Sequence, residues 1–295
     1  MRASTSSRHI LRSAKNIRTL HTTVQRQTSL ASSSSSSTVN PDEIAHFSRL
    51  SAQWWDERGE FGMLHKMNPV RTQFVREKLV EMEYEDGHED LNEAKVLEGL
   101  KVLDVGCGGG LFSESLTRLG ANTLGIDASA SNIAIASLHA SNDPALSFTS
   151  SSLPQRFGSS VSHKGKGKLT YEHTSVEDLL AREGPNSFDV VCSMEVVEHV
   201  DNPRAFLTSC AEILKPGGHL FLSTIARTPL AYFLTIFSAE QLLRFVTPGT
   251  HTWSKYINPS ELTSFFHNLH SSSSLSSPSS GEIEVKGQTM DIEVG

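Results

Sequence analysis

Cysteine is scarce in this sequence, and long apolar runs are missing from it. The 295 residues include only three cysteines, Cys107, Cys192 and Cys210. Three thiols, two of them inside strongly apolar segments, exclude a disulfide framework and favour a reducing compartment. No run reaches the roughly 18 apolar residues that a membrane-spanning helix needs, which speaks against an integral membrane protein. The overall composition, 37% hydrophobic and 20% charged, is typical of a soluble chain.

Acidic residues are absent from the first 40 positions. That segment carries six basic residues, is rich in serine, and ends in an unbroken serine run at 32–37. Arginine and serine without acidic residues are typical of a mitochondrial transit peptide. We therefore predict a transit peptide and a serine-rich linker over residues 1–40. The alternative is a disordered tail that carries no targeting signal.

Basic residues are few in the rest of the chain. The formal net charge is −7, but without the six N-terminal cations 20 basic residues face 33 acidic ones, which leaves −13. Nucleic-acid binding requires a basic face, so we expect no nucleic acid as a partner. The length suits one large domain. We place it at 41–295, with low-complexity insertions at 141–168 and 271–280.

Strand and helix patterns alternate between residues 101 and 224. The pattern predicts strands at 101–105, 122–126, 169–173, 188–193 and 219–224, and helices at 111–119, 132–140, 176–182 and 203–214. Upstream, we expect a helix from Asp42, a loop over 60–71 and a helix over 71–82. Alternating elements indicate an α/β fold whose parallel sheet is covered by helices on both faces. Ligands of such sheets bind at the carboxyl ends of the strands.

A glycine-rich loop follows the first of these strands. Gly106, Gly108 and Gly110 separate the strand from the next helix, and glycine lets the backbone approach a ligand closely. Asp127 ends the second strand, 21 positions after Gly106, where a carboxylate can accept hydrogen bonds from ribose hydroxyls. The pattern therefore predicts a ribose-bearing ligand. The alternative is a glycine turn that only packs a helix on a strand.

The loop departs from the dinucleotide fingerprint G-x-G-x-x-G. The position of its third glycine is Leu111 when counted from Gly106, and Ser113 when counted from Gly108. Asp104 precedes the loop, and a carboxylate there would repel a pyrophosphate. It suits a ligand with an ammonium group and no phosphates, of which S-adenosylmethionine is one. A nicotinamide oxidoreductase is accordingly disfavoured.

The motifs resemble those of a known family. They are DVGCGGG at 104–110 with Asp127, FSRLSAQWWD at 47–56, GEF at 59–61, LH at 64–65, NPVR at 68–71, MEVVEHV at 194–200, LKPGG at 214–218 and PGTH at 248–251. Together they resemble the Rossmann-like S-adenosylmethionine-dependent methyltransferases, and within them the ubiquinone-biosynthesis O-methyltransferases. The resemblance covers about residues 42–262. It implies a mostly parallel seven-stranded sheet, whose last strand we expect to be truncated because the sequence ends soon after 290–294.

The resemblance also assigns cofactor contacts. The family's positions for binding S-adenosylmethionine match Arg71, Gly106, Asp127 and Met194. A guanidinium can pair with the carboxylate of the cofactor, and Met194 would line its adenine pocket. The alternatives are a surface ion pair for Arg71 and an ordinary core position for Met194.

Three chemically active side chains follow the fourth strand. Glu195, Glu198 and His199 have helical spacing and lie on one face if the chain turns helical after Ser193. Two carboxylates and an imidazole suit a divalent cation, and the resemblance implies Mg2+ at these three positions. We expect His199 and Glu198 to be catalytic, with one of them accepting the proton of a catechol hydroxyl. The alternative is a purely structural cap of the strand.

The resemblance implies a cellular setting as well. It predicts a polyprenylated catechol substrate, a peripheral position on the matrix side of the mitochondrial inner membrane, and a complex with other coenzyme Q biosynthesis proteins. The most apolar stretch, 229–246, is either an interfacial helix that meets the membrane or a core helix. Two further functions stay open: another small-molecule methyltransferase, and a non-catalytic scaffold of a membrane-peripheral complex.

Overall fold

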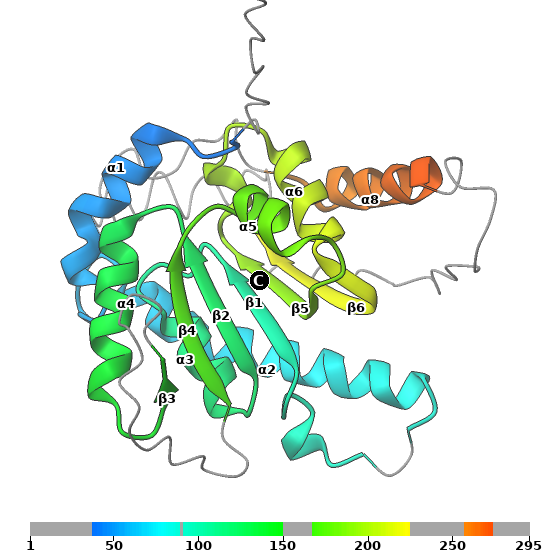
Figure 1. Cartoon of the computed structure of the whole chain (residues 1–295), viewed down its shortest axis with the longest axis horizontal. Helices are drawn as coiled ribbons and strands as arrows, with labels where there is room; N and C mark the ends of the chain where they lie inside the picture. Colours follow the sequence, from blue (N-terminus) through cyan, green and yellow to red (C-terminus); the bar gives the residue numbers. More distant parts are fainter. Residues whose placement is uncertain (1–36, 89–90, 150–166, 225–256, 274–295) are drawn as a thin grey trace, which may run out of the picture. The chain divides into compact units, whose positions relative to one another are not determined.

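A parallel sheet forms the centre of the fold (Figure 1). The computed structural model describes residues 37–88, 91–149, 167–224 and 257–273. In this part six strands run in the order β3-β4-β2-β1-β5-β6, and every neighbouring pair is parallel. The strands are β1 Lys101–Val105, β2 Asn122–Asp127, β3 Ser147–Phe148, β4 Lys168–His173, β5 Phe188–Met194 and β6 Leu214–Ser223. The predicted α/β fold is confirmed; the end of the chain, where the last strand was expected, lies outside the described residues.

Helices alternate with the strands as predicted. They are α1 Pro41–Leu50, α2 Gly62–Glu85, α3 Leu111–Arg118, α4 Ala130–Asn142, α5 Val176–Glu183, α6 Pro203–Glu212 and α8 Pro259–Ser273, with 3-10 turns η1 Ser51–Gln53, η2 Glu93–Lys95 and η3 Val197–His199. Three of the helices that follow a strand begin at a side-chain cap: Ser129, Ser175 and Asn202 accept a hydrogen bond from a backbone N–H of the first turn. These caps explain why the helix starts follow the strands so closely.

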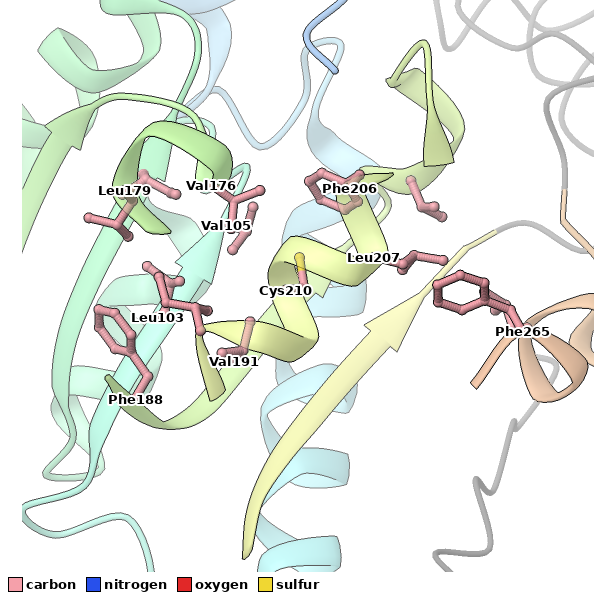
Figure 2. Close-up of a cluster of buried hydrophobic side chains, with 14 residues drawn as sticks. Leu103, Val105, Val176, Leu179, Phe188, Val191, Phe206, Leu207, Cys210 and Phe265 are labelled. Atoms are coloured by element: carbon pink, nitrogen blue, oxygen red, sulfur yellow. The ribbon is translucent and has the colours of Figure 1, made fainter. Parts of the chain in front are cut away.

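The sheet has an apolar core on each face. On one face, Leu103 and Val105 of β1 pack with residues of α5, α6 and α8. Figure 2 shows this cluster, with Phe206 and Cys210 of α6 among its side chains. On the other face, Val102 of β1 packs with residues of α2 and α3. Successive residues of a strand point to opposite faces, so a short apolar strand supplies both cores.

The predicted loop over residues 60–71 is wrong, because α2 begins at Gly62 and continues through Pro69. Proline removes one backbone hydrogen bond from a helix interior and usually ends it. Here neighbouring contacts compensate. The buried Asn68 donates to Ser115 of α3, and Thr72 donates its hydroxyl to the carbonyl of Asn68. Tertiary packing thus overrides the local signal.

The sequence also misplaces the start of β6. The segment LKPGG was expected to close the preceding helix, with a strand from His219, but β6 begins at Leu214. Phe188 of β5 pairs with Leu214, whereas Val190 pairs with His219, so the register shifts between the two pairs. The proline and glycines are therefore accommodated as an irregularity inside the strand.

Four of the predicted special segments fall partly or wholly outside the described residues. Of the insertion expected at 141–168, residues 141–149 complete α4 and form β3; of the one expected at 271–280, residues 271–273 end α8. The apolar stretch 229–246 and most of the transit peptide lie outside. Within the ranges that the structure covers, no helix combines the length and apolar character needed to cross a bilayer.

The strand order contains one switch point. β1 pairs with β2 on one side and with β5 on the other, and the crossovers run in opposite directions from there. In doubly wound sheets ligands bind at such a point, beyond the carboxyl ends of the strands. The glycine loop follows β1 and the segment from Glu195 to His199 follows β5. The fold therefore brings these two segments to one edge.

Candidate active site

The glycine loop needs its glycines for two reasons. Gly106, Gly108 and Gly110 have φ values of 75°, 53° and 87°, in the left-handed region that favours glycine. There is also no room for a side chain: a Cβ on Gly108 would come within 2.3 Å of Trp54, and one on Gly110 within 2.1 Å of the Tyr171 hydroxyl. Here the loop backbone comes close to the side chains of Trp54 and Tyr171, and its predicted close approach to a ligand stays a prediction.

Asp127 organises the loop from the end of β2. One carboxylate oxygen accepts a hydrogen bond from the backbone N–H of Gly108 at 2.9 Å, and the other from that of Ser129 at 2.7 Å. Burial raises the pKa of Asp127, while these backbone donors oppose the shift. The carboxylate is where the sequence predicted a partner for ribose hydroxyls, directly against the glycine loop.

Asp104 lies beneath the loop and is almost fully buried, with 2% of its surface exposed. Burial raises its pKa to about 6, although a hydrogen bond from the Ser113 hydroxyl and the nearby positive charge of Arg71 lower it. A buried carboxylate of this kind adds negative potential where an ammonium group would be favoured. This agrees with the argument against a pyrophosphate ligand.

Two adjacent tryptophans cover the loop from outside. The ring of Trp54 stacks on Phe61 at 3.8 Å, and its Nε1 donates to Asn132 of α4. Trp55 donates from Nε1 to the carbonyl of Gly109 at 3.0 Å. Sequence reasoning found both as part of the motif FSRLSAQWWD and predicted no contact between them and the glycine loop. The only available signal was that WWD is a diagnostic part of the family pattern.

These residues fit S-adenosylmethionine in kind. Asp127 can accept from a ribose, and Asp104 and Asp127 give the edge the negative charge that suits a cationic donor. Met194 is half-buried and packs against the cluster formed by α2, α3 and the sheet. Its Sδ accepts a hydrogen bond from Ser223 at 3.3 Å, so its predicted adenine contact stays a prediction.

Arg71 contacts the segment from Glu195 to His199 rather than the glycine loop. From α2 it forms an ion pair with Glu195, whose other carboxylate oxygen accepts a hydrogen bond from Ser223 at 2.6 Å. Both charged side chains are largely buried, with 11% and 21% exposed. Glu195 itself has a φ of 53°, which is unusual for a residue with a side chain. Arg71 therefore contacts a predicted metal ligand, and its contact with the cofactor carboxylate remains a prediction.

Glu198 is the most buried side chain of this segment. Only 3% of its surface is exposed, and burial raises its pKa. Thr224 donates to one carboxylate oxygen at 3.1 Å, whereas the other oxygen, Oε1, is buried and has no hydrogen-bond partner among the described residues. An unpartnered buried carboxylate oxygen is costly and points to a proton, a ligand or an ion that completes it.

His199 is held by α1, which lies far away in the sequence. Its Nδ1 lies 3.1 Å from a carboxylate oxygen of Glu43, and Phe47 contacts the imidazole edge to face at 5.1 Å. Sequence reasoning found His199 but missed Glu43. No local signal could have found it, because 156 positions separate the two residues.

The expectation that Glu195, Glu198 and His199 share one helical face is wrong. Only Val197–His199 forms a single 3-10 turn, and Glu195 precedes it in a left-handed conformation. The three side chains have different partners: Arg71 and Ser223, Thr224, and Glu43. In the part of the chain that is described, no group of three or more His, Cys, Asp or Glu residues is arranged to hold a metal ion.

Comparison with known proteins extends these observations. Residues 71–269 match a family described as a methyltransferase domain. The ubiquinone biosynthesis O-methyltransferase of Rhodopseudomonas palustris is 42% identical over 238 residues, which cover 81% of this chain and 82% of that protein. That of a Bradyrhizobium species is 43% identical over 229 residues, 78% of this chain and 79% of that protein.

A eukaryotic protein is similar over a comparable share of the chain. The rat protein named ubiquinone biosynthesis O-methyltransferase, mitochondrial, is 42% identical over 231 residues, which cover 78% of this chain and 60% of the rat protein. The fold, the glycine loop with its acidic residue, and these identities agree. The chain belongs to the ubiquinone biosynthesis O-methyltransferases, a family of S-adenosylmethionine-dependent methyltransferases.

Proposed function

We propose that this chain transfers a methyl group from S-adenosylmethionine to catechol hydroxyls of polyprenylated ubiquinone precursors, 3,4-dihydroxy-5-polyprenylbenzoate and demethylubiquinol. The observation that carries the proposal is that two chemically different segments flank one switch point of the sheet. The glycine loop and Asp127 suit a nucleoside, and the segment from Glu195 to His199 suits a phenolic hydroxyl. The names of the similar proteins support the pathway.

The donor side of the site consists of the glycine loop, Asp104 and Asp127. Its residues position the methyl donor and take no chemical part in the transfer. S-adenosylmethionine, when bound, supplies a sulfonium methyl group and leaves as S-adenosylhomocysteine. Asp127 and the loop backbone orient the ribose, and the buried Asp104 favours the cationic end. Trp54 and Trp55 close the loop on its outer side, which excludes water from it. Fixed donor geometry removes part of the entropic barrier to transfer.

The acceptor side of the site is the segment from Glu195 to His199. Its residues remove the proton of the catechol hydroxyl that receives the methyl group. A catechol hydroxyl is a weak nucleophile until it loses its proton. His199 has a carboxylate on Nδ1, and its Nε2 has no hydrogen-bond partner within the described ranges. We assign Nε2 as the acceptor of the hydroxyl proton, while the oxygen–methyl bond forms and the sulfur–methyl bond breaks. Glu198 precedes His199 in the chain, and its buried Oε1 has no hydrogen-bond partner among the described residues. This oxygen can hold the neighbouring hydroxyl of the catechol.

A divalent cation, with Mg2+ as the first choice, belongs to the proposal through Glu195, Glu198 and His199. What supports it is the set of residue types, two carboxylates and an imidazole. The described arrangement does not fit a bound cation, since Glu195 is paired with Arg71 and no metal cluster is assembled. Replacing Glu195 or Glu198 by alanine should abolish any metal-dependent turnover and leave cofactor binding intact. Full activity of both variants in a chelator would remove the cation from the proposal.

The proposed location is mitochondrial, peripheral on the matrix side of the inner membrane, in a complex with other coenzyme Q biosynthesis proteins. The name of the rat relative supports the compartment, and the acid-free segment 1–40 supports a transit peptide. Flotation of the mature protein with liposomes tests the membrane contact. Recovery of all protein in the lipid-free fraction at low and moderate salt would count against it.

A methyl-transfer assay on a short-chain prenyl catechol tests the reaction. We expect transfer of labelled methyl from S-adenosylmethionine to one catechol oxygen, identified by mass spectrometry. Parallel reactions with EDTA, and with added divalent ions, decide whether a cation takes part. S-adenosylhomocysteine binding without any methyl transfer would instead favour a non-catalytic scaffold, and transfer only to unprenylated acceptors would favour another small-molecule methyltransferase.

A further inference from the structure

Glu43 and His199 form a carboxylate–imidazole pair at the edge of the proposed site. The contact joins α1 to the 3-10 turn after β5, with 3.1 Å between Nδ1 of His199 and Oε2 of Glu43. Both side chains are mostly buried, with 17% of His199 and 20% of Glu43 exposed. An ionised carboxylate can only accept a hydrogen bond, so Nδ1 must carry the proton. In a neutral ring, Nε2 then carries the lone pair.

Several independent contacts hold Glu43 in place. Asn40 caps α1, accepting hydrogen bonds from the backbone N–H groups of Asp42 and Glu43. The same Asn40 donates to Asp201, two residues after His199, at 2.6 Å. Further along α1, the hydroxyl of Ser48 lies 2.7 Å from that of Ser129, next to the Asp127 loop. The helix is therefore fixed at both ends to the edge of the sheet that carries the site.

Phe47 restricts the imidazole from another side. Its ring meets His199 at 89°, with 5.1 Å between the ring centres. Because Phe47 follows Glu43 by one helical turn, the two residues present a carboxylate and an aromatic ring on the same face of α1. One fixes the tautomer of the imidazole and the other limits its rotation.

We propose that Glu43 is the positioning residue for His199: by accepting the Nδ1 proton it keeps the lone pair on Nε2, where it receives the catechol proton. This inference rests on the proposed function and adds to it a residue from a distant segment. Glu43 acts through His199 and does not touch the substrate. The contact prepares Nε2 for the role of proton acceptor.

The test compares two acidic residues of one helical turn. Glu43→Ala removes the carboxylate on His199, and Asp42→Ala removes an exposed one from the same first turn of α1. Both variants lose a similar favourable interaction with the helix dipole. The comparison therefore separates the loss of the helix-dipole interaction from the loss of the side-chain contacts of Glu43, among them the one with His199.

The first readout is the tautomer of His199, from nitrogen chemical shifts of protein labelled at histidine and studied at alkaline pH, where imidazoles are neutral. His199→Ala identifies the signal among the 13 histidines. We expect the Nδ1–H form in the wild type and in Asp42→Ala, and a shift towards the Nε2–H form in Glu43→Ala. An unchanged tautomer in Glu43→Ala would overturn the proposal.

The second readout is methyl transfer on the prenyl catechol. We expect kcat of Glu43→Ala to fall about 10- to 100-fold, with KM for S-adenosylmethionine unchanged, because only the acceptor side is altered. Added formate should restore part of kcat in Glu43→Ala and have no effect on Asp42→Ala. Equal losses in the two variants, or no rescue by formate, would contradict a positioning role. A wild type without methyl transfer would overturn the proposed function itself, while the tautomer would still decide whether Glu43 sets the state of His199.

Discussion

The two sides of the switch point are built in different ways. On the donor side, the backbone of the two flanking loops satisfies the acidic residue: Asp127 accepts from Gly108 and from Ser129. On the acceptor side, each side chain depends on a distant element. Glu195 meets Arg71 of α2, and His199 meets Glu43 of α1.

The donor side is therefore a preformed binding site, whereas the acceptor side is assembled by contacts between distant parts of the chain. The donor side is formed by the sheet and its loops, so it should bind its ligand with little rearrangement. The acceptor side contains an unusual backbone conformation at Glu195 and a buried oxygen on Glu198 that no described residue contacts by a hydrogen bond. Such features cluster where a site is completed by a ligand. Substitutions on the two sides should therefore change different measured quantities.

The largest effect is expected from His199→Ala. Loss of the proton acceptor should lower kcat by about 10²- to 10⁴-fold, while the dissociation constant of S-adenosylhomocysteine changes less than about threefold. Kinetics and calorimetry on the same preparation measure both. His88→Ala is the matched control, since this exposed histidine is paired with Glu83 at the end of α2. A large loss of S-adenosylhomocysteine affinity in His199→Ala would show that His199 also contributes to cofactor binding, and would contradict the separation of the two sides.

Trp54→Ala tests how firmly the donor side is closed. The indole is buried, stacks on Phe61 and donates to Asn132. Its removal should lower the free energy of unfolding by about 3–5 kcal/mol, as for large aromatic residues in cores. Urea denaturation measures the loss, and Tyr84→Ala, at an exposed position of α2, should cost far less. Equal costs would mean that Trp54 does not seal the loop.

Asp104→Asn probes the buried charge beneath the glycine loop. The pKa of Asp104 is raised to about 6 from an ordinary 3.8, so its stabilising contribution is complete below about pH 4 and is lost as the pH rises through 6. Asparagine does not titrate. Relative to the wild type, the unfolding free energy of the variant should therefore rise by on the order of 3 kcal/mol between pH 4 and pH 7. A pH-independent difference between the two proteins would contradict the assigned burial.

The smallest effect is expected from Asp127→Asn. The substitution removes the negative charge that accepts hydrogen bonds from the ribose hydroxyls. S-adenosylhomocysteine should therefore bind roughly 10- to 100-fold more weakly. Calorimetry measures this affinity directly. Asp143→Asn at the other end of α4, where the carboxylate pairs with Arg118, is the control and should bind normally. Unchanged affinity in Asp127→Asn would remove the ribose contact from the account.

The sequence predicts the donor side well because its signals are local. An apolar run, a set of glycines and an acidic residue 21 positions on suffice to place β1, the loop and β2. Helix starts after Ser129, Ser175 and Asn202 are local as well, since each cap bonds within its own first turn. Hydrophobic periodicity and the residues that start or end helices are enough to predict structure wherever the interacting groups are neighbours in the chain.

The acceptor side could be predicted only as a set of residue types. Helical spacing placed Glu195 with Glu198 and His199, but the left-handed conformation of Glu195 breaks that register. Arg71 is 124 positions away from its partner Glu195, and Glu43 is 156 positions away from His199. The helix through Pro69 follows the same rule, because a side-chain contact with α3 supports it. Contacts of this range are set by packing, which a single sequence does not display.

A double-mutant cycle on Asp127→Asn and His199→Ala tests the central claim most directly. The quantity is kcat/KM for methyl transfer, measured for the wild type, the two single variants and the double variant. Because one side binds the donor and the other activates the acceptor, the account predicts that the two losses multiply, with a coupling energy within about 0.5 kcal/mol. A double variant no worse than His199→Ala alone would show that the two residues act as one unit, and would contradict the account.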